Sequence, residues 1–128
     1  MTAEIKFYPC SIEPVDWENL ASNNQWIDNK QQAVALKLRY GNNSLNTRNA
    51  DSLYQTTAIY VFVIGGGDRW ITADKCSGEV IGDKIIVKYA PLINHSEVGE
   101  TAPSIICMEL NKLKYPDYKK MKIVYKEI

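Results

Sequence analysis

A chain of 128 residues has the usual size of one domain and is too short for two well-formed hydrophobic cores. Its 45% hydrophobic and 23% charged residues are ordinary for a globular protein and exclude wholesale disorder. Fifteen basic and fifteen acidic residues cancel, so the chain lacks the overall positive charge that favours nucleic acid or anionic membranes as partners. No apolar run approaches the ~20 residues that a helix needs to cross a bilayer, and we expect no membrane insertion.

The single predicted helix lies near the N-terminus. Pro14 suits the first position of a helix, where its missing N–H costs no hydrogen bond. Trp17, Leu20 and Ala21 follow at the spacing that places apolar side chains on one helical face. The polar residues 22–24 end the pattern, so the helix has about two turns.

Two segments in the first half of the chain predict strands of different burial. Residues 32–40 alternate, with one apolar set formed by Val34, Leu36, Leu38 and Tyr40. Lys37 and Arg39 face the other way, so this strand covers a core on one face and meets water on the other. Residues 57–64 are apolar in both alternating sets, and this strand should be central and buried on both sides.

Further strand-like segments occupy residues 3–8, 69–73, 79–81, 84–89, 104–110 and 121–126. Residues 74–78 predict a bulge or turn. Gly82-Asp83 predicts a type II′ hairpin, because a glycine in the first loop position adopts positive φ without a Cβ clash. Lysines gather between Lys112 and Lys126, which predicts a final edge strand protected from aggregation by its charge.

About seven short strands with almost no helix predict an all-β single domain over residues 1–128. A β-sandwich and a small barrel are both compatible with this pattern, and an open sheet with one covering helix is a third choice. Two polar segments, 41–52 and 91–103, are predicted to be long loops, which in compact domains are often functional.

Three cysteines, Cys10, Cys76 and Cys107, are too few for a disulfide scaffold and too widely spaced for a zinc or redox motif. They leave room for one bridge and one free thiol. The first residues contain no basic segment followed by an apolar one, so we expect no signal peptide in the chain as given. The compartment stays open between the cytoplasm and, if a preceding signal has been removed, the periplasm or exterior.

The glycine-rich stretch Gly65-Gly66-Gly67-Asp68-Arg69 follows a hydrophobic strand, as a nucleotide-binding loop would. A phosphate loop needs a helix N-terminus behind it, however, and residues 70–73 continue as a strand. We therefore expect a hairpin or inter-sheet connection here and no bound cofactor.

His95 is the only histidine, so any cysteine–histidine enzyme must pair it with one of the three cysteines. None of these cysteines lies in a nucleophile motif. His95, Glu97 and Glu100 together would form a weak metal site with a single imidazole ligand. We predict neither a catalytic residue nor a metal ligand.

The aromatic residues offer large, rigid contact area. We expect Trp17 and Trp26 to be buried, as tryptophans in small β domains usually are. Trp70 lies beside the triple glycine and an arginine, so burial and exposure are equally expected there. Tyr115 and Tyr118 flank a proline turn, where at least one of them should be exposed.

Residues 57–127 resemble the C-terminal domain family of the bacterial protease-complex subunit PrcB. The features that carry the resemblance are short aliphatic strands and a proline-started loop, at Tyr60–Gly65, Ile85–Tyr89, Thr101–Pro103 and Lys122–Tyr125. The family's threonine-glycine-glycine-tyrosine loop is absent, and Gly66–Trp70 stands near that place. The resemblance implies a non-catalytic β domain that associates with another protein, such as a protease.

The leading hypothesis is a non-enzymatic domain that binds another protein, of a protease-associated, inhibitor or immunity type, because loops on a rigid framework are where recognition usually resides. The predicted binding residues are Gly65, Gly66, Gly67, Asp68, Arg69, Trp70, His95, Glu97 and Tyr118. The glycines would pair through their backbone, Asp68 or Arg69 would form ion pairs, and Trp70 would be buried by the partner.

Two other classes of function remain open. A small-ligand or carbohydrate-binding module would use Trp70 or Tyr118 as a stacking platform. A hydrolase with a site that no motif reveals would require a cleft that brings His95 or several carboxylates together. The sequence does not indicate an oligomeric state.

Overall fold

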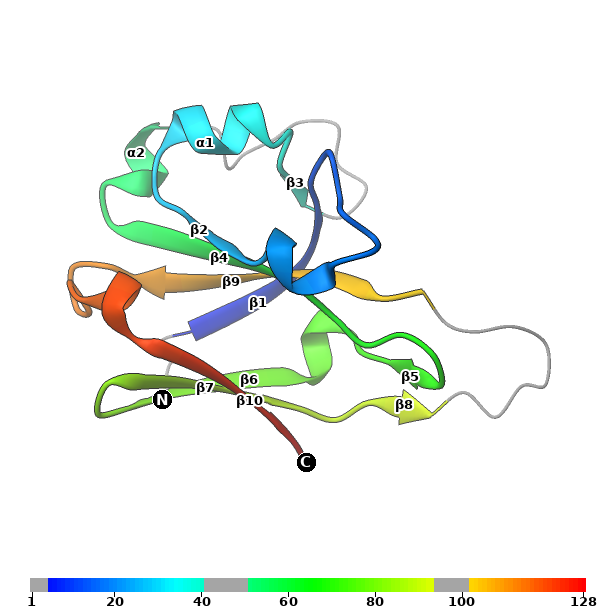
Figure 1. Cartoon of the computed structure of the whole chain (residues 1–128). Coiled ribbons are helices and arrows are strands. Elements are labelled where there is room, and N and C mark those ends of the chain that lie inside the picture. The colour runs from blue at the N-terminus through cyan, green and yellow to red at the C-terminus, as the bar shows by residue number, and fades with distance from the viewer. Residues whose placement is uncertain (1–4, 41–50, 94–101) are drawn as a thin grey trace.

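The computed structural model of the chain describes residues 5–40, 51–93 and 102–128. Two sheets lie one above the other, and two short helices cover the far face of the larger sheet (Figure 1). The fold is all-β, as predicted, and neither sheet closes into a barrel. The ten strands exceed the expected seven because four of them are only two or three residues long.

The larger sheet contains, in spatial order, β2 (Gln25–Ile27), β4 (Thr57–Ile64), β9 (Ser104–Asn111), β1 (Ile5–Ser11) and β3 (Arg39–Tyr40). The smaller sheet contains β10 (Lys122–Glu127), β7 (Lys84–Tyr89) and β6 (Cys76–Ile81). A separate ribbon pairs β5 (Arg69–Trp70) with β8 (Leu92–Ile93). The helical elements are α1 (Lys30–Ala35), α2 (Asp51–Tyr54) and the 3-10 turns η1 (Leu20–Asn23), η3 (Ala73–Lys75) and η4 (Tyr118–Lys120).

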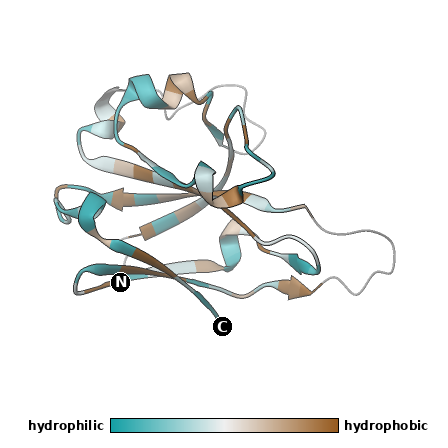
Figure 2. Cartoon of the chain, in the orientation of Figure 1, coloured by the Kyte–Doolittle hydropathy of each residue, from teal (hydrophilic) through white to brown (hydrophobic). Residues whose placement is uncertain are grey.

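The main hydrophobic core lies between the two sheets. Phe62 of β4 is completely buried there, and Ile85 and Val87 reach it from β7. Ile106 and Met108 join them from β9. Figure 2 shows hydrophobic segments in these strands, interrupted by hydrophilic ones. This burial fixes the two sheets as one sandwich.

A second core covers the opposite face of the larger sheet. Ile59 and Val61 of β4 pack there with Leu38, with Ala33 of α1 and with Tyr54 of α2. Since Phe62 points into the first core, β4 is buried on both faces, which confirms the prediction for residues 57–64. The physical reason is that one core covers each face of the larger sheet at β4.

The predicted strand over residues 32–40 is wrong for most of its length, because α1 occupies residues 30–35. The Asn29 side chain caps this helix by accepting a hydrogen bond from the Gln32 N–H at 2.8 Å. The Gln32 side chain accepts in turn from the Asp28 N–H at 2.8 Å. Val34 in α1 is exposed, Leu38 after the helix is buried, and Tyr40 lies in β3, so the alternating residues do not form one face of a strand.

Helix α1 ends with the paired hydrogen bonds of a Schellman motif. Leu38 N–H donates to the Ala33 carbonyl at 3.0 Å, and Lys37 N–H donates to the Val34 carbonyl at 3.1 Å. Lys37 has φ +51°, in the left-handed region that a lysine adopts only at a cost.

We predict that Lys37→Gly will raise the free energy of unfolding by about 1 kcal/mol, because glycine takes positive φ freely. The lost ion pair with Glu13, 3.4 Å long and exposed on both sides, contributes little. Urea unfolding of the variant beside Lys37→Ala, which keeps the Cβ, measures the effect. Equal stability of the two variants would show that the backbone at this position is not strained.

The predicted helix over residues 14–21 is also wrong. The Asp16 carboxylate accepts hydrogen bonds from the Glu18 N–H at 3.1 Å and from the Asn19 N–H at 3.0 Å, which folds the chain into a polar turn. Only the short η1 follows. Trp17 therefore lies on a turn and is 56% exposed, contrary to the expected burial, whereas Trp26 packs against Tyr60 and Tyr118.

The C-terminal half follows the prediction more closely. β6 and β7 form the expected hairpin, in which Ile81 pairs with Lys84 and Gly82 has φ +60°. β10 is an edge strand, as its lysines predicted, and it runs parallel to β7. Among the described ranges, no helix is long and apolar enough to cross a membrane.

Candidate functional site

The ribbon formed by β5 and β8 projects beyond the two sheets (Figure 1) and carries large exposed side chains. Trp70 pairs with Leu92, and Arg69 pairs with Ile93. Because paired residues of an antiparallel ribbon share a face, Trp70 and Leu92 lie together on one face. They are 50% and 46% exposed, and β8 stands out as a hydrophobic arrow in Figure 2. We call these two residues the Trp70–Leu92 face.

The three glycines form a tight turn between β4 and β5. Gly66 and Arg69 exchange two backbone hydrogen bonds, of 2.9 and 3.0 Å. Gly66 has φ +105°, and a Cβ added to it would lie 3.2 Å from the ring of Pro103. Both facts require glycine at this position. This tight turn agrees with the hairpin or inter-sheet connection expected here. It also sets where β5, which carries Trp70, begins.

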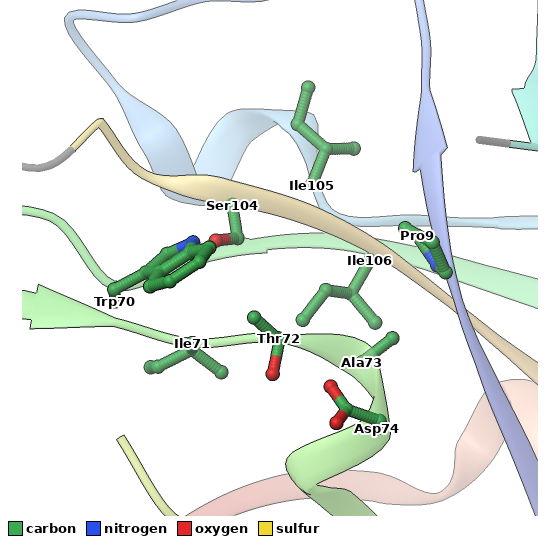
Figure 3. A pocket seen from close by; sticks show the side chains of 9 residues that line it. All are labelled: Pro9, Trp70, Ile71, Thr72, Ala73, Asp74, Ser104, Ile105 and Ile106. Carbon is green, nitrogen blue, oxygen red and sulfur yellow. The ribbon is translucent and has the colours of Figure 1, made fainter. Parts of the chain in front are cut away.

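A groove of about 420 Å³ opens beside Trp70, between the larger sheet and the segment that leads into β6. Its lining residues are Pro9, Trp70, Ile71, Thr72, Ala73, Asp74, Ser104, Ile105 and Ile106. Figure 3 shows Trp70 and Pro9 at opposite ends of the groove. Ile71, Ala73 and Ile106 are buried, so they form an apolar floor that belongs to the main core.

The lining of the groove also contains three polar side chains, those of Thr72, Asp74 and Ser104. A hydrogen bond with the Thr72 side chain is the main cause that holds the pKa of Asp74 below its usual range. The carboxylate is therefore ionised at neutral pH and places one negative charge beside the groove. An apolar group with a cationic end matches such a lining.

Arg69 lies on the reverse face of the ribbon. Its guanidinium is 3.8 Å from the Asp68 carboxylate and 3.7 Å from that of Glu127. Both ion pairs are solvent-exposed and contribute little to the free energy of folding. They orient Arg69 toward the C-terminal strand and away from Trp70, so the predicted ion-pairing residues do not line the groove.

The three cysteines resolve into one bridge and one free thiol. Cys10 of β1 and Cys107 of β9 form a disulfide between neighbouring strands. Cys76 is half-buried, and its thiol lies 3.6 Å from the Thr72 carbonyl. A cysteine–histidine pair could therefore use only Cys76, and His95 lies outside the described residues.

Burial raises the pKa of the Cys76 thiol to about 11, and the negative charge of Asp74 adds to the effect. We predict that alkylation of native Cys76 by iodoacetamide at pH 8 will be about two orders of magnitude slower than that of free cysteine, because the thiolate is the reactive form. The rate should rise tenfold per pH unit up to about pH 10. A rate that levels off near pH 9 would contradict the raised pKa.

Tyr118 does not supply the exposed aromatic surface expected of it. Its side chain is 6% exposed, its hydroxyl donates to the Asp28 carboxylate at 2.8 Å, and its ring packs edge-on against Trp26. The other predicted binding residues, His95 and Glu97, lie outside the described residues. So do Glu100 and the rest of the loop 94–101. Within the ranges that are described, no three acidic, cysteine or histidine side chains are grouped to hold a metal ion.

The structure adds Leu92 and the groove residues to the predicted site. Leu92-Ile93 is an apolar pair inside the polar segment 91–103, and this was the available sequence signal. Pro9 and Ser104–Ile106 could not be found in this way, because only the pairing of β9 with β4 and with β1 brings them to the groove.

Comparison of the chain with protein-family models, with curated proteins and with solved structures finds no match.

Proposed function

We propose that this chain is a non-enzymatic domain that binds another protein through the Trp70–Leu92 face and the adjoining groove. The observation that carries the proposal is the pairing of two exposed apolar side chains, Trp70 and Leu92, of which Trp70 also lines an apolar groove. Isolated exposed hydrophobic residues are common on protein surfaces, whereas contiguous ones next to a concavity are typical of interaction sites.

The chemistry of the surface favours a protein partner. Tryptophan is enriched among the residues that dominate binding energy, because it buries a large area while only two torsions are fixed. Leu92 extends the contact on the same face, and the floor of the groove is buried. A partner side chain with an apolar stem and a basic end, such as lysine or arginine, would fill the groove and place its charge near Asp74.

We propose a protease, or the target of an inhibitor or immunity factor, as the kind of protein that this domain binds. A protease-associated role is supported by the resemblance of residues 57–127 to the PrcB C-terminal domain family, and an inhibitor or immunity role by loops on a rigid β framework.

Affinity purification from the native organism, followed by identification of the co-purifying proteins, tests the proposal. The bait is the intact chain, and the matched control is Trp17→Ala, which removes another exposed tryptophan from a different surface. We expect a protein that is captured by the unchanged chain and by Trp17→Ala but lost with Trp70→Ala. A partner that is retained equally by all three baits would place the interface elsewhere.

One observation favours a second candidate, a carbohydrate-binding module. The Trp70 indole stands beside Ser104, and Thr72 and Asp74 line the same groove farther from the indole (Figure 3). Sugar sites commonly combine an aromatic face with hydroxyl and carboxylate groups. Glycan-array binding that disappears in Trp70→Ala, with no protein recovered by the affinity purification, would favour this candidate. The buried ring of Tyr118 offers no stacking surface for it.

A further inference from the structure

The outer edge of β10 is an unpaired sheet edge with a defined hydrogen-bonding pattern. Lys122 N–H donates to the Asp83 carbonyl at 3.0 Å, and Ile128 N–H donates to the Tyr89 carbonyl at 2.8 Å. In a parallel pair, alternate residues face the partner strand, so the backbone groups of Ile123, Tyr125 and Glu127 face away from β7. In the described part of the chain, β7 is the only strand that pairs with β10.

The lysines of β10 lie beside lysines of β7. The register places Lys122 next to Lys84 and Lys126 next to Lys88. Ile85 and Val87 point into the core, so these four lysines point to the outer face of the sheet. Like charges in neighbouring positions of a sheet are destabilising.

Only one carboxylate on this face offsets the four lysines, among the described residues of the three strands. Glu79 of β6 lies 2.8 Å from the Lys88 amine. The other three amines remain a concentration of positive charge on a chain whose net charge is zero. Charge complementarity therefore favours an acidic partner for this face.

The inner side of the same edge carries the apolar side chains of Ile123 and Tyr125, followed by Glu127, whose carboxylate pairs with Arg69. The side chain of Tyr125 is 36% exposed and packs against Phe62, with ring centroids 5.6 Å apart. A strand added beside β10 would alternate its side chains between this apolar side and the lysine side.

We infer that the free edge of β10 binds an extended segment of a partner protein in which acidic residues alternate with apolar ones. The segment would complete the backbone hydrogen bonds of Ile123, Tyr125 and Glu127, as in recognition by strand addition. Its acidic side chains would lie beside Lys122 and Lys126, and its apolar side chains would cover Tyr125.

Other molecules would match fewer features of the β10 edge, which are its free backbone groups, its lysines and its apolar side chains. A second copy of β10 would place lysine beside lysine, which is how charged edge strands avoid self-association. A nucleic acid or an anionic membrane would meet the lysines, but neither would pair with the N–H and C=O groups of the edge. An extended polypeptide satisfies the backbone, the charges and the apolar side together.

The test uses a fluorescent peptide, Val-Glu-Val-Glu-Val-Glu-Val, titrated with the intact chain at low salt and followed by anisotropy. We expect saturable binding that Lys122→Glu/Lys126→Glu weakens about tenfold or more, because two attractive pairs become repulsive. Lys30→Glu/Lys37→Glu changes the net charge equally on the helical layer and should leave the affinity unchanged. Circular dichroism checks that both variants are folded.

A second probe separates strand addition from simple charge attraction. The same peptide with alternate backbone amides N-methylated on its docking edge keeps every charge but cannot donate hydrogen bonds, and it should not bind. Equal binding of the methylated peptide, or no saturable binding of the parent peptide up to about 1 mM, would overturn the inference. So would a greater affinity for single-stranded DNA or for vesicles of anionic lipid.

This inference does not depend on the function proposed for the groove. Trp70→Ala should leave the affinity for the acidic peptide unchanged, whereas it should abolish capture of the groove's partner.

Discussion

Replacing Trp70 with alanine should weaken binding of the partner by about 2 kcal/mol, or roughly 30-fold in Kd. The indole is half-exposed in the free chain and would be buried by the partner, so its removal subtracts contact area mainly from the complex. For the same reason the free energy of unfolding should change by less than about 1 kcal/mol. Calorimetric titration with the purified partner and urea unfolding of the free variant give the two numbers.

Two other tryptophans supply the controls for this prediction. Trp17→Ala should change neither binding nor stability appreciably, since Trp17 lies exposed on a turn. Trp26→Ala should lower stability, because Trp26 packs between Tyr60 and Tyr118. If Trp70→Ala unfolds the chain while the affinity of the remaining folded protein is unchanged, Trp70 is a core residue and the proposed interface is wrong.

The second large effect concerns the disulfide between Cys10 and Cys107. Removing it should lower the free energy of unfolding by about 3–5 kcal/mol, because the bridge joins residues 97 positions apart and restricts the unfolded chain. Cys107 is also completely buried, so its replacement must keep a small apolar side chain.

Cys10→Ala/Cys107→Ala, compared with the unchanged chain in urea with and without reductant, measures this effect. Reductant should destabilise the unchanged chain and leave the double variant unaffected. Thiol titration of the denatured, unreduced chain should find one free thiol, that of Cys76. Three free thiols in protein purified without reductant would contradict the bridge.

Strand prediction succeeded where one physical cause dominated the pattern. Residues 57–64 are apolar in both alternating sets because β4 is buried on both faces. Gly82 marks a hairpin because the turn itself requires positive φ. Lysines mark β10 because an edge strand is exposed. Each of these signals is local and does not depend on distant residues.

Prediction failed where several local rules competed. Residues 32–40 alternate like a strand, yet Asn29 and Gln32 carry the capping signal of a helix, and the cap decides the structure. Over six residues of helix, a period of 3.6 cannot be told from a period of two. The apolar spacing after Pro14 failed similarly, because Asp16 stabilises a turn through its own hydrogen bonds.

The candidate site was found only in part for a different reason. Trp70 could be singled out because a glycine turn precedes it, but its neighbours in the groove come from β1 and β9, far away in the sequence. The burial of Tyr118 likewise depends on Asp28 and Trp26, which only the folded chain brings to it. Local patterns can nominate a residue, whereas tertiary pairing determines what surrounds it.

Amide hydrogen exchange of the chain, alone and saturated with its captured partner, tests the central claim most directly. The proposal predicts slower exchange in the complex at residues 69–74, 92–93 and 104–106, and unchanged exchange in α1 on the opposite layer. Protection confined to α1, or to any surface that leaves residues 69–74 unchanged, would contradict the Trp70–Leu92 face as the binding site.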